Sequence, residues 1–170
     1  MKSVYNFVVT PKGDRYNNKK KVDGGELILN TEIYNHQYVN REATVISTPI
    51  IGDTGIKLGD TIIVHHNVFR RWHDVKGVEK NSRSYFNEST YFITNDQIYL
   101  YKRKNKWLAP KGYCFVKPLK AVDKFNIKRE KPLQGVVKYS DGTVNVNDLV
   151  GFTPNSEYEF IVDGEKLYRV

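Results

Sequence analysis

Short segments rich in β-branched and aromatic residues recur along the chain, and each is bounded by Gly, Pro, Asn or Asp. They span residues 4–9, 43–46, 60–64, 89–93, 97–101, 113–116, 135–139, 149–152, 159–162 and 166–170. Such segments are typical of β-strands, and no window of about 11 residues shows the apolar period of a helix. The sequence therefore predicts an all-β chain of small barrels or sandwiches. Asp163-Gly164, between the last two segments, favours a type I′ hairpin.

An internal repeat organises these segments. Residues 5–9 match residues 113–117, and residues 58–64 match residues 146–152. Phe7 and Asp60 lie 53 residues apart, whereas Phe115 and Asp148 lie 33 residues apart, so the first copy holds an insertion. A charge run and a proline interrupt the pattern between residues 104 and 110. The predicted domains are residues 1–104 and residues 105–170. The second is loop-less and has no counterpart of residues 97–101 up to Val170; the sequence leaves open whether a further strand follows.

The insertion, about residues 11–42, is polar and has no periodicity. It contains a glycine pair followed by aliphatic residues, Gly24-Gly25-Glu26-Leu27-Ile28-Leu29. Loops of this length are uncommon in compact domains and are usually functional or disordered. We interpret the insertion as a mobile peptide that carries a hydrophobic hook for another protein. The alternative is a solvated insertion whose aliphatic side chains pack back onto the body.

The order of these features resembles the GroES co-chaperonin family over about residues 4–101. The resemblance is carried by the glycine-aliphatic loop, by the strand region 41–46, by residues 56–64 with their Leu58-Gly59-Asp60 turn, and by the closing region 91–100. Residues 113–170 resemble a second, loop-less GroES-like unit more faintly, as in tandem co-chaperonins. Glu26 departs from the family, which usually places an aliphatic residue directly after the glycine pair.

The resemblance implies two tandem irregular antiparallel β-barrels, with a long flexible loop in the first. In the family this loop docks an aliphatic tripeptide into a groove on a GroEL-type chaperonin and caps the chamber in which a client protein folds. By position, the docking residues are Leu27, Ile28 and Leu29, while Gly24 and Gly25 supply the hinge and the turn. ATP is bound by the partner chaperonin only, so no cofactor is expected here.

The resemblance also implies a homo-oligomeric ring that assembles through the terminal strands of each subunit. On these strands, Tyr5, Phe7, Ile98 and Leu100 are the candidate subunit-interface residues. A ring is physically sensible, because burying three aliphatic side chains contributes roughly 5–9 kcal/mol while ordering about six loop residues costs roughly 6–12 kcal/mol. Several weak hooks on one ring would bind together.

The charge of the chain raises an alternative partner. Lys and Arg number 27 against 19 Asp and Glu, a net charge of +8, and clustered basic residues favour nucleic acid. The alternative function is therefore a basic β-barrel that binds nucleic acid through the segment Arg70 to Lys80 and the turn at Lys102 to Lys106. Because the clusters lie at turns and strand ends, solvated connections explain them as well.

Sequence motifs of catalysis are missing: there is no P-loop, Gly-x-Ser-x-Gly or His-Glu-x-x-His, and we expect no enzymatic activity. A single cysteine, Cys114, cannot form an internal disulfide. His65, His66 and His73 lack the pattern of a metal site, so none is expected. No apolar run of about 18 residues and no signal peptide is present, which predicts a soluble cytoplasmic protein without a membrane partner. The richness in Lys, Asn and Tyr suggests an AT-rich genome, such as that of a bacterial virus.

Overall fold

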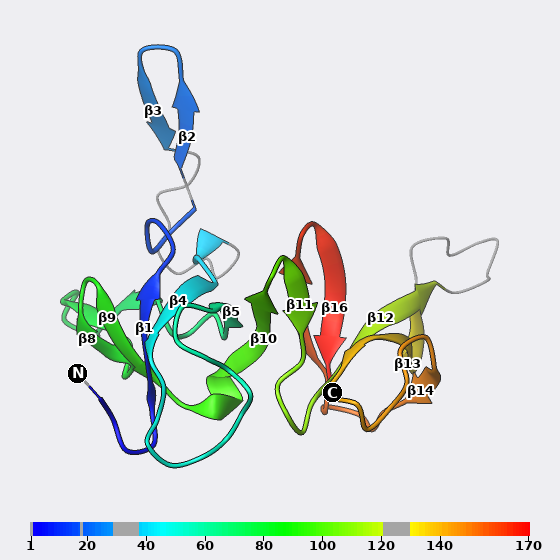
Figure 1. Cartoon of the computed structure of the whole chain (residues 1–170). Coiled ribbons are helices and arrows are strands. Elements are labelled where there is room, and N and C mark those ends of the chain that lie inside the picture. Colours follow the sequence, from blue (N-terminus) through cyan, green and yellow to red (C-terminus); the bar gives the residue numbers. More distant parts are fainter. Residues whose placement is uncertain (1, 18, 29–37, 121–129) are drawn as a thin grey trace. The chain divides into compact units, whose positions relative to one another are not determined.

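The computed structural model describes the chain except for residues 1, 18, 29–37 and 121–129 (Figure 1). The described residues form antiparallel sheets and one short 3₁₀ helix, η2 (Asn95–Gln97). The prediction of an all-β chain is thus confirmed. The chain divides into two compact units, Met1–Arg103 and Lys104–Val170, which is one residue from the predicted division.

The first unit contains a main sheet and two separate hairpins. Its strands are β1 (Phe7–Pro11), β2 (Lys19–Val22), β3 (Gly25–Ile28), β4 (Glu42–Ser47), β5 (Thr61–Val64), β6 (Arg71–His73), β7 (Glu79–Asn81), β8 (Tyr85–Asn87), β9 (Thr90–Ile93) and β10 (Ile98–Arg103). Within the unit, the sheet runs β10-β5-β4-β1-β9-β8, while β2 pairs with β3 and β6 with β7. No pairing joins β8 to β10 in the part of the chain that the structure describes, so the sheet is open there and barrel closure is not observed.

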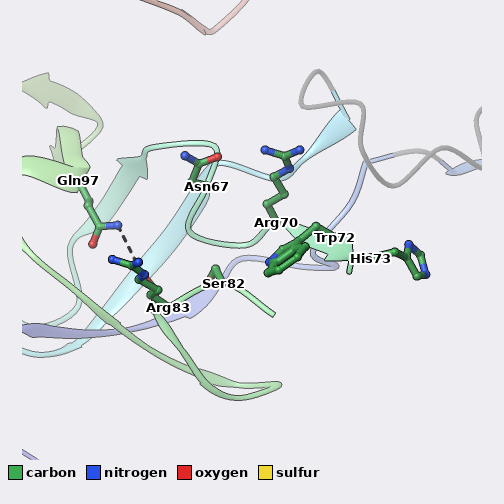
Figure 2. Close-up of a pocket in the computed structure, with 8 residues that line it drawn as sticks. Asn67, Arg70, Trp72, His73, Ser82, Arg83 and Gln97 are labelled. Atoms are coloured by element: carbon green, nitrogen blue, oxygen red, sulfur yellow. Dashed lines mark hydrogen bonds between the residues drawn. The ribbon is translucent and has the colours of Figure 1, made fainter. Parts of the chain in front are cut away.

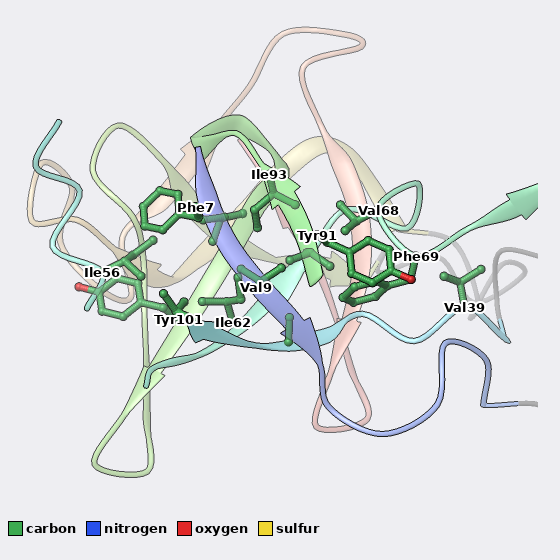
Figure 3. Packing of buried hydrophobic residues seen from close by; sticks show 14 of the residues in the cluster. Phe7, Val9, Val39, Ile56, Ile62, Val68, Phe69, Tyr91, Ile93 and Tyr101 are labelled. Atoms are coloured by element: carbon green, nitrogen blue, oxygen red, sulfur yellow. The ribbon is translucent and has the colours of Figure 1, made fainter. Parts of the chain in front are cut away.

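Alternate residues of the central strands form the core of the first unit (Figure 3). The inward positions are Phe7 and Val9 of β1, Ala43 and Val45 of β4, Ile62 and Val64 of β5, and Tyr91 and Ile93 of β9. Successive side chains of a strand point to opposite faces, which is why the alternating apolar pattern folds as observed. Phe69 packs edge-on against Tyr91, with ring centroids 4.8 Å apart, and closes one end of this core.

A buried ion pair fixes the start of β5 to the end of β10. Arg103 donates from Nε to Asp60 Oδ1 at 3.1 Å and from Nη2 to Oδ2 at 2.5 Å, and also to the carbonyl of Gly55 at 2.7 Å. The backbone amide of Lys57 donates to Asp60 Oδ2 at 2.8 Å. Burial of Asp60 opposes its ionisation, but the hydrogen bonds from Arg103 and Lys57 and their positive charges outweigh it, so the pKa of Asp60 is lowered.

The second unit contains six described strands, five of which form a smaller antiparallel sheet. Its strands are β11 (Lys106–Leu108), β12 (Cys114–Lys120), β13 (Glu130–Ser140), β14 (Leu149–Gly151), β15 (Tyr158–Val162) and β16 (Glu165–Arg169). The sheet runs β14-β13-β12-β16-β15. Asp163 and Gly164 form the two-residue turn between β15 and β16 with φ of 49° and 76°, the conformation of a type I′ turn, so the predicted hairpin is confirmed.

The internal repeat is visible in the order of the strands. The second unit's order β14-β13-β12-β16-β15 reproduces the first unit's order β5-β4-β1-β9-β8. Equivalent turns lead into β5 and β14: the amide of Gly59 donates to the carbonyl of Val45, and the amide of Asn147 to that of Val137, both at 2.8 Å. Gly59 and Asn147 both have positive φ, 87° and 75°. The two units are therefore two copies of one sheet design.

The structural equivalence differs by one residue from the sequence match. Val9 pairs with Val45, and Val116 pairs with Val137, so Val116 occupies the position of Val9, whereas the sequence match aligned it with Val8. An irregularity in the ladder precedes each of these pairs. The irregularity falls at the same place in both copies and leaves Ile46 and Lys138 as the extra residues of β4 and β13. It therefore supports the structural equivalence and is not the cause of the one-residue difference.

The connection that differs most in length between the two units is the one from β1 to β4, which corresponds to the connection from β12 to β13. In the first unit, β1 ends at Pro11 and β4 begins at Glu42; in the second, Lys120 at the end of β12 pairs with Glu130 at the start of β13. Residues 121–129, which join them, lie outside the described residues. The second unit thus has a short connection at the place where the first has its long loop.

Candidate functional site

Part of the long loop forms an exposed β-hairpin. Strands β2 and β3 pair from Lys19↔Ile28 to Val22↔Gly25, and every described side chain from Lys19 to Leu27 is exposed. Leu27 is 52% exposed and Val22 48% exposed, so Leu27 does not pack back onto the body. Of the other predicted docking residues, Leu29 and the side chain of Ile28 lie outside what the structure describes.

The two glycines of the hairpin have different roles. Asp23 and Gly24 form the turn, and Gly24 has a φ of 97°, a conformation that side chains with a Cβ rarely adopt. Gly25 is the first residue of β3 and pairs with Val22. A Cβ built on either glycine meets no atom within 4 Å. The backbone conformation therefore requires glycine at position 24 and not at position 25.

The ladder decides which side chains of the hairpin share a face. Leu27 lies opposite Lys20, and because strand residues alternate between faces, Val22 shares the face of Lys20 and Leu27. Glu26 belongs to the other face, where its carboxylate lies 3.3 Å from Lys19 Nζ. Glu26 therefore does not interrupt the face of Leu27, although it departs from the family pattern. A flat partner surface would meet alternate residues of β3 instead of a run of three.

Backbone hydrogen bonds join the two legs of the loop, for example from the amide of Lys12 to the carbonyl of Glu42 at 2.9 Å, and a buried side-chain amide reinforces this pairing. Asn40, which is 3% exposed, donates from Nδ2 to the carbonyls of Lys12 at 3.1 Å and Asp14 at 2.9 Å. Its Oδ1 accepts the amide of Glu42 at 2.9 Å, and its own amide donates to the carbonyl of Arg15 at 2.8 Å. Asn40 thus clamps the outgoing leg of the loop to the returning leg. We call these two paired legs, residues 12–17 and 38–42, the stem.

Arg15 and Tyr16 attach this stem to the rest of the first unit. The Arg15 guanidinium, 8% exposed, donates to the carbonyl of Phe69 at 3.1 Å and to Asn81 Oδ1 at 2.8 Å. The Tyr16 hydroxyl accepts the amide of Arg71 at 2.8 Å. The base of the loop is therefore fixed to the outer ends of β6 and β7 and to Phe69, just before β6. Sequence reasoning did not identify Arg15 and Tyr16.

The predicted subunit-interface residues have unlike environments. Phe7 and Ile98 belong to the core of the first unit and Leu100 is also buried, whereas Tyr5 is 71% exposed. Of the four side chains, only that of Tyr5 is available to a neighbouring molecule as the unit stands. Pairing of these strands with another subunit stays a prediction.

Outside the undescribed stretches, no group of three or more His, Cys, Asp or Glu is placed to hold a metal ion. Over the same part of the chain, no helix has the length and apolar character needed to cross a bilayer. Burial raises the pKa of the Cys114 thiol, which disfavours the reactive thiolate.

Comparison of the chain with protein-family models, curated proteins and solved structures found no match. The interpretation of the hairpin therefore depends on the residues and their geometry.

Proposed function

We propose that this chain is a co-chaperonin, a non-catalytic lid that docks onto a GroEL-type chaperonin through the β2–β3 hairpin and assists ATP-dependent folding of client proteins. The observation that supports the proposal best is an exposed apolar side chain, Leu27, on a hairpin that rises from a clamped stem. This hairpin lies where the resemblance to the GroES family predicts the docking loop. The chain itself needs no ATP site for this role.

The hairpin would bind weakly as a single copy. Full burial of an aliphatic side chain contributes about 1.5–3 kcal/mol, and Leu27 and Val22 have about half of their surface left to bury. Together they would contribute roughly 1.5–3 kcal/mol, which by itself corresponds to a dissociation constant weaker than about 1 mM. The pairing of β2 with β3 lowers the ordering cost, because these residues are already arranged before docking.

Weak single contacts suit a ring of identical subunits. Once one hairpin is docked, the others bind at high effective concentration, so the ring gains affinity without a new type of contact. Each hairpin also dissociates easily when the partner changes its conformation, as a reusable lid requires. The proposal therefore includes a homo-oligomeric ring that acts on a chaperonin in the cytoplasm.

The experiment is co-migration with a GroEL-type chaperonin in the presence of nucleotide on a sizing column. We expect the unmodified protein to co-migrate and Leu27→Asp to elute separately, because a carboxylate on the docking face would have to be buried. Leu58→Asp is the matched control, since Leu58 is 71% exposed but lies outside the hairpin, and it should still co-migrate. Circular dichroism verifies that both variants fold. The proposal would be overturned if Leu27→Asp and Leu58→Asp co-migrated with the chaperonin to the same extent, or if the unmodified protein did not co-migrate.

A further inference from the structure

The surface of the first unit contains a hollow of about 560 Å³, and none of its lining residues belongs to the β2–β3 hairpin (Figure 2). Its walls come from the turn after β5, from the start of β6, from the segment between β7 and β8, and from η2. This volume lies within the range of small-molecule sites, roughly 300–1,000 Å³. The hollow is therefore large enough for a nucleotide.

Two arginines make the hollow basic. Arg70 and Arg83 line it from different segments, and no Asp or Glu is among its lining residues. The acidic residues of the β6–β7 hairpin form ion pairs with other basic residues. Glu79 Oε1 lies 3.3 Å from Arg71 Nη1, and Asp74 Oδ2 lies 3.7 Å from Lys80 Nζ. The positive charge of the two lining arginines is thus not neutralised from within the hollow, which favours an anion.

Arg70 also carries a donor that the protein does not use. Its Nε is buried and has no hydrogen-bond partner among the described residues. A buried donor without a partner costs free energy, and a bound acceptor would relieve that cost. Guanidinium groups bind phosphate through paired charge-assisted hydrogen bonds, so a phosphate oxygen is a suitable acceptor here.

An aromatic ring stands beside this charge. Trp72, the residue at the centre of β6, lines the hollow and is 43% exposed. Proteins that bind single-stranded nucleic acid combine basic side chains with exposed aromatic rings on which the bases stack. The side chains of Asn67 and Gln97 line the same hollow and supply amide groups; the Oε1 of Gln97 accepts the amide of Thr94 at 3.0 Å, which fixes this side chain.

We propose that the hollow binds a nucleotide unit, with its phosphate on Arg70 and Arg83 and its base on Trp72. The unit could come from a free nucleotide or from a single strand of nucleic acid, which share this chemistry. This proposal is independent of the co-chaperonin function, because it uses neither the stem nor the β2–β3 hairpin. Either proposal can fail while the other stands.

The test uses Trp72 as its own reporter. The chain has two tryptophans; the other, Trp107, is 8% exposed and donates from Nε1 to Asp163 at 2.7 Å. In the full chain carrying Trp107→Phe, quenching of the remaining indole is titrated with AMP, with a ten-nucleotide oligo(dT) and with inorganic phosphate. Quenching by AMP assigns a free nucleotide, and quenching by the oligonucleotide alone assigns a single strand.

Paired variants separate the hollow from general charge. Arg70→Gln/Arg83→Gln should weaken nucleotide binding at least tenfold at about 0.15 M salt. Lys2→Gln/Lys111→Gln removes the same charge from exposed positions outside the hollow and outside the basic segments named above, and it should change binding less than threefold. Because Arg70 is partly buried, Arg83→Gln alone at an exposed position serves as a second variant. Trp72→Ala, followed by anisotropy of a labelled oligonucleotide or nucleotide, should lose at least fivefold. Three results would each overturn the proposal: no quenching by either AMP or oligo(dT), equal effects of the two double variants, or unchanged binding by Trp72→Ala.

Discussion

Replacing Asn40 by alanine tests whether one buried side chain holds the base of the long loop. The substitution removes two hydrogen bonds from Nδ2, to the carbonyls of Lys12 and Asp14, and one bond from the amide of Glu42 to Oδ1. These bonds connect residues that are 28, 26 and 2 positions apart in sequence. The two bonds from Nδ2, which join residues distant in sequence, tie the outgoing leg of the loop to the returning leg. Their loss should therefore loosen the stem.

The magnitude follows from the number of bonds and from the burial of their partners. Each hydrogen bond contributes about 0.5–1.5 kcal/mol net, so three of them amount to roughly 1.5–4.5 kcal/mol. Asn40 is only 3% exposed, but Lys12 and Asp14 are exposed, so water can satisfy part of what is lost. We expect Asn40→Ala to lower the free energy of unfolding by about 2–3 kcal/mol. Asn40→Asp should lose more, because a carboxylate oxygen would face two carbonyls.

Urea unfolding followed by far-UV circular dichroism measures this loss. Asn17→Ala is the matched control, because Asn17 is exposed and the structure records only its backbone amide in a bond, to the carbonyl of Tyr38 at 2.6 Å; it should change stability by less than about 0.5 kcal/mol. Asn40→Ala should also weaken co-migration with a chaperonin, although Leu27 is intact. An Asn40→Ala protein as stable as the Asn17→Ala control would refute the clamp.

Two further predictions concern backbone conformation and a buried charge. Gly24→Ala should destabilise the β2–β3 hairpin by about 1–2 kcal/mol, because φ at this position is 97°, while Gly25→Ala should not; faster amide exchange in the hairpin of only the first variant is the expected result, and equal exchange in both would contradict it. Asp60→Asn should lower the free energy of unfolding by about 2–3 kcal/mol at pH 7, because it breaks a mostly buried pair with Arg103. Since the pKa of Asp60 in the folded protein is lowered, the contribution of Asp60 to stability is present above its ordinary pKa and is lost as pH falls through the folded pKa. Urea unfolding at pH 7 and pH 3 should therefore show that the unmodified protein and Asp60→Asn differ less in stability at pH 3. The same difference at both pH values would show that the charge of Asp60 is not the cause.

The strands of the main sheets were predictable because burial leaves a pattern in the sequence. Ala43 and Val45 of β4, and Tyr91 and Ile93 of β9, are buried positions two residues apart in sequence with less buried residues between them, which is the period of a strand with one buried face. The turn at Asp163-Gly164 was predictable for a related reason, since few residue pairs adopt two successive positive φ angles.

The exposed hairpins were missed because they bury nothing. In β2 every side chain is exposed, and β6 and β7 contain no fully buried residue, so no alternation of apolar residues marks them. A turn signal was present in the second case: Asp74 Oδ1 accepts the amides of Lys76 and Val78, and Gly77 has a φ of 76°. Asn40 could not be identified in this way, because the partners of its Nδ2 are backbone carbonyls distant in sequence.

The two copies of one sheet within a single chain act as an internal comparison that separates scaffold from function. Both copies retain the strand order, the extra residue in β4 and β13, and the turn that leads into β5 and β14. The copies differ in two connections. The first unit has the clamped loop with its hairpin between β1 and β4, and it inserts the β6–β7 hairpin between β5 and β8, whereas only residues 152–157 separate β14 from β15.

A scaffold needs neither addition, because the second unit forms its sheet without an equivalent of β6–β7 and with a shorter connection after β12. Exposed insertions that leave the sheet unchanged are where binding functions are usually located. The first insertion presents Leu27 on an exposed face, and the second presents Trp72 beside two arginines. Deleting residues 74–78 to shorten the β6–β7 turn should therefore leave co-migration with a chaperonin intact, whereas shortening the β2–β3 hairpin should abolish it.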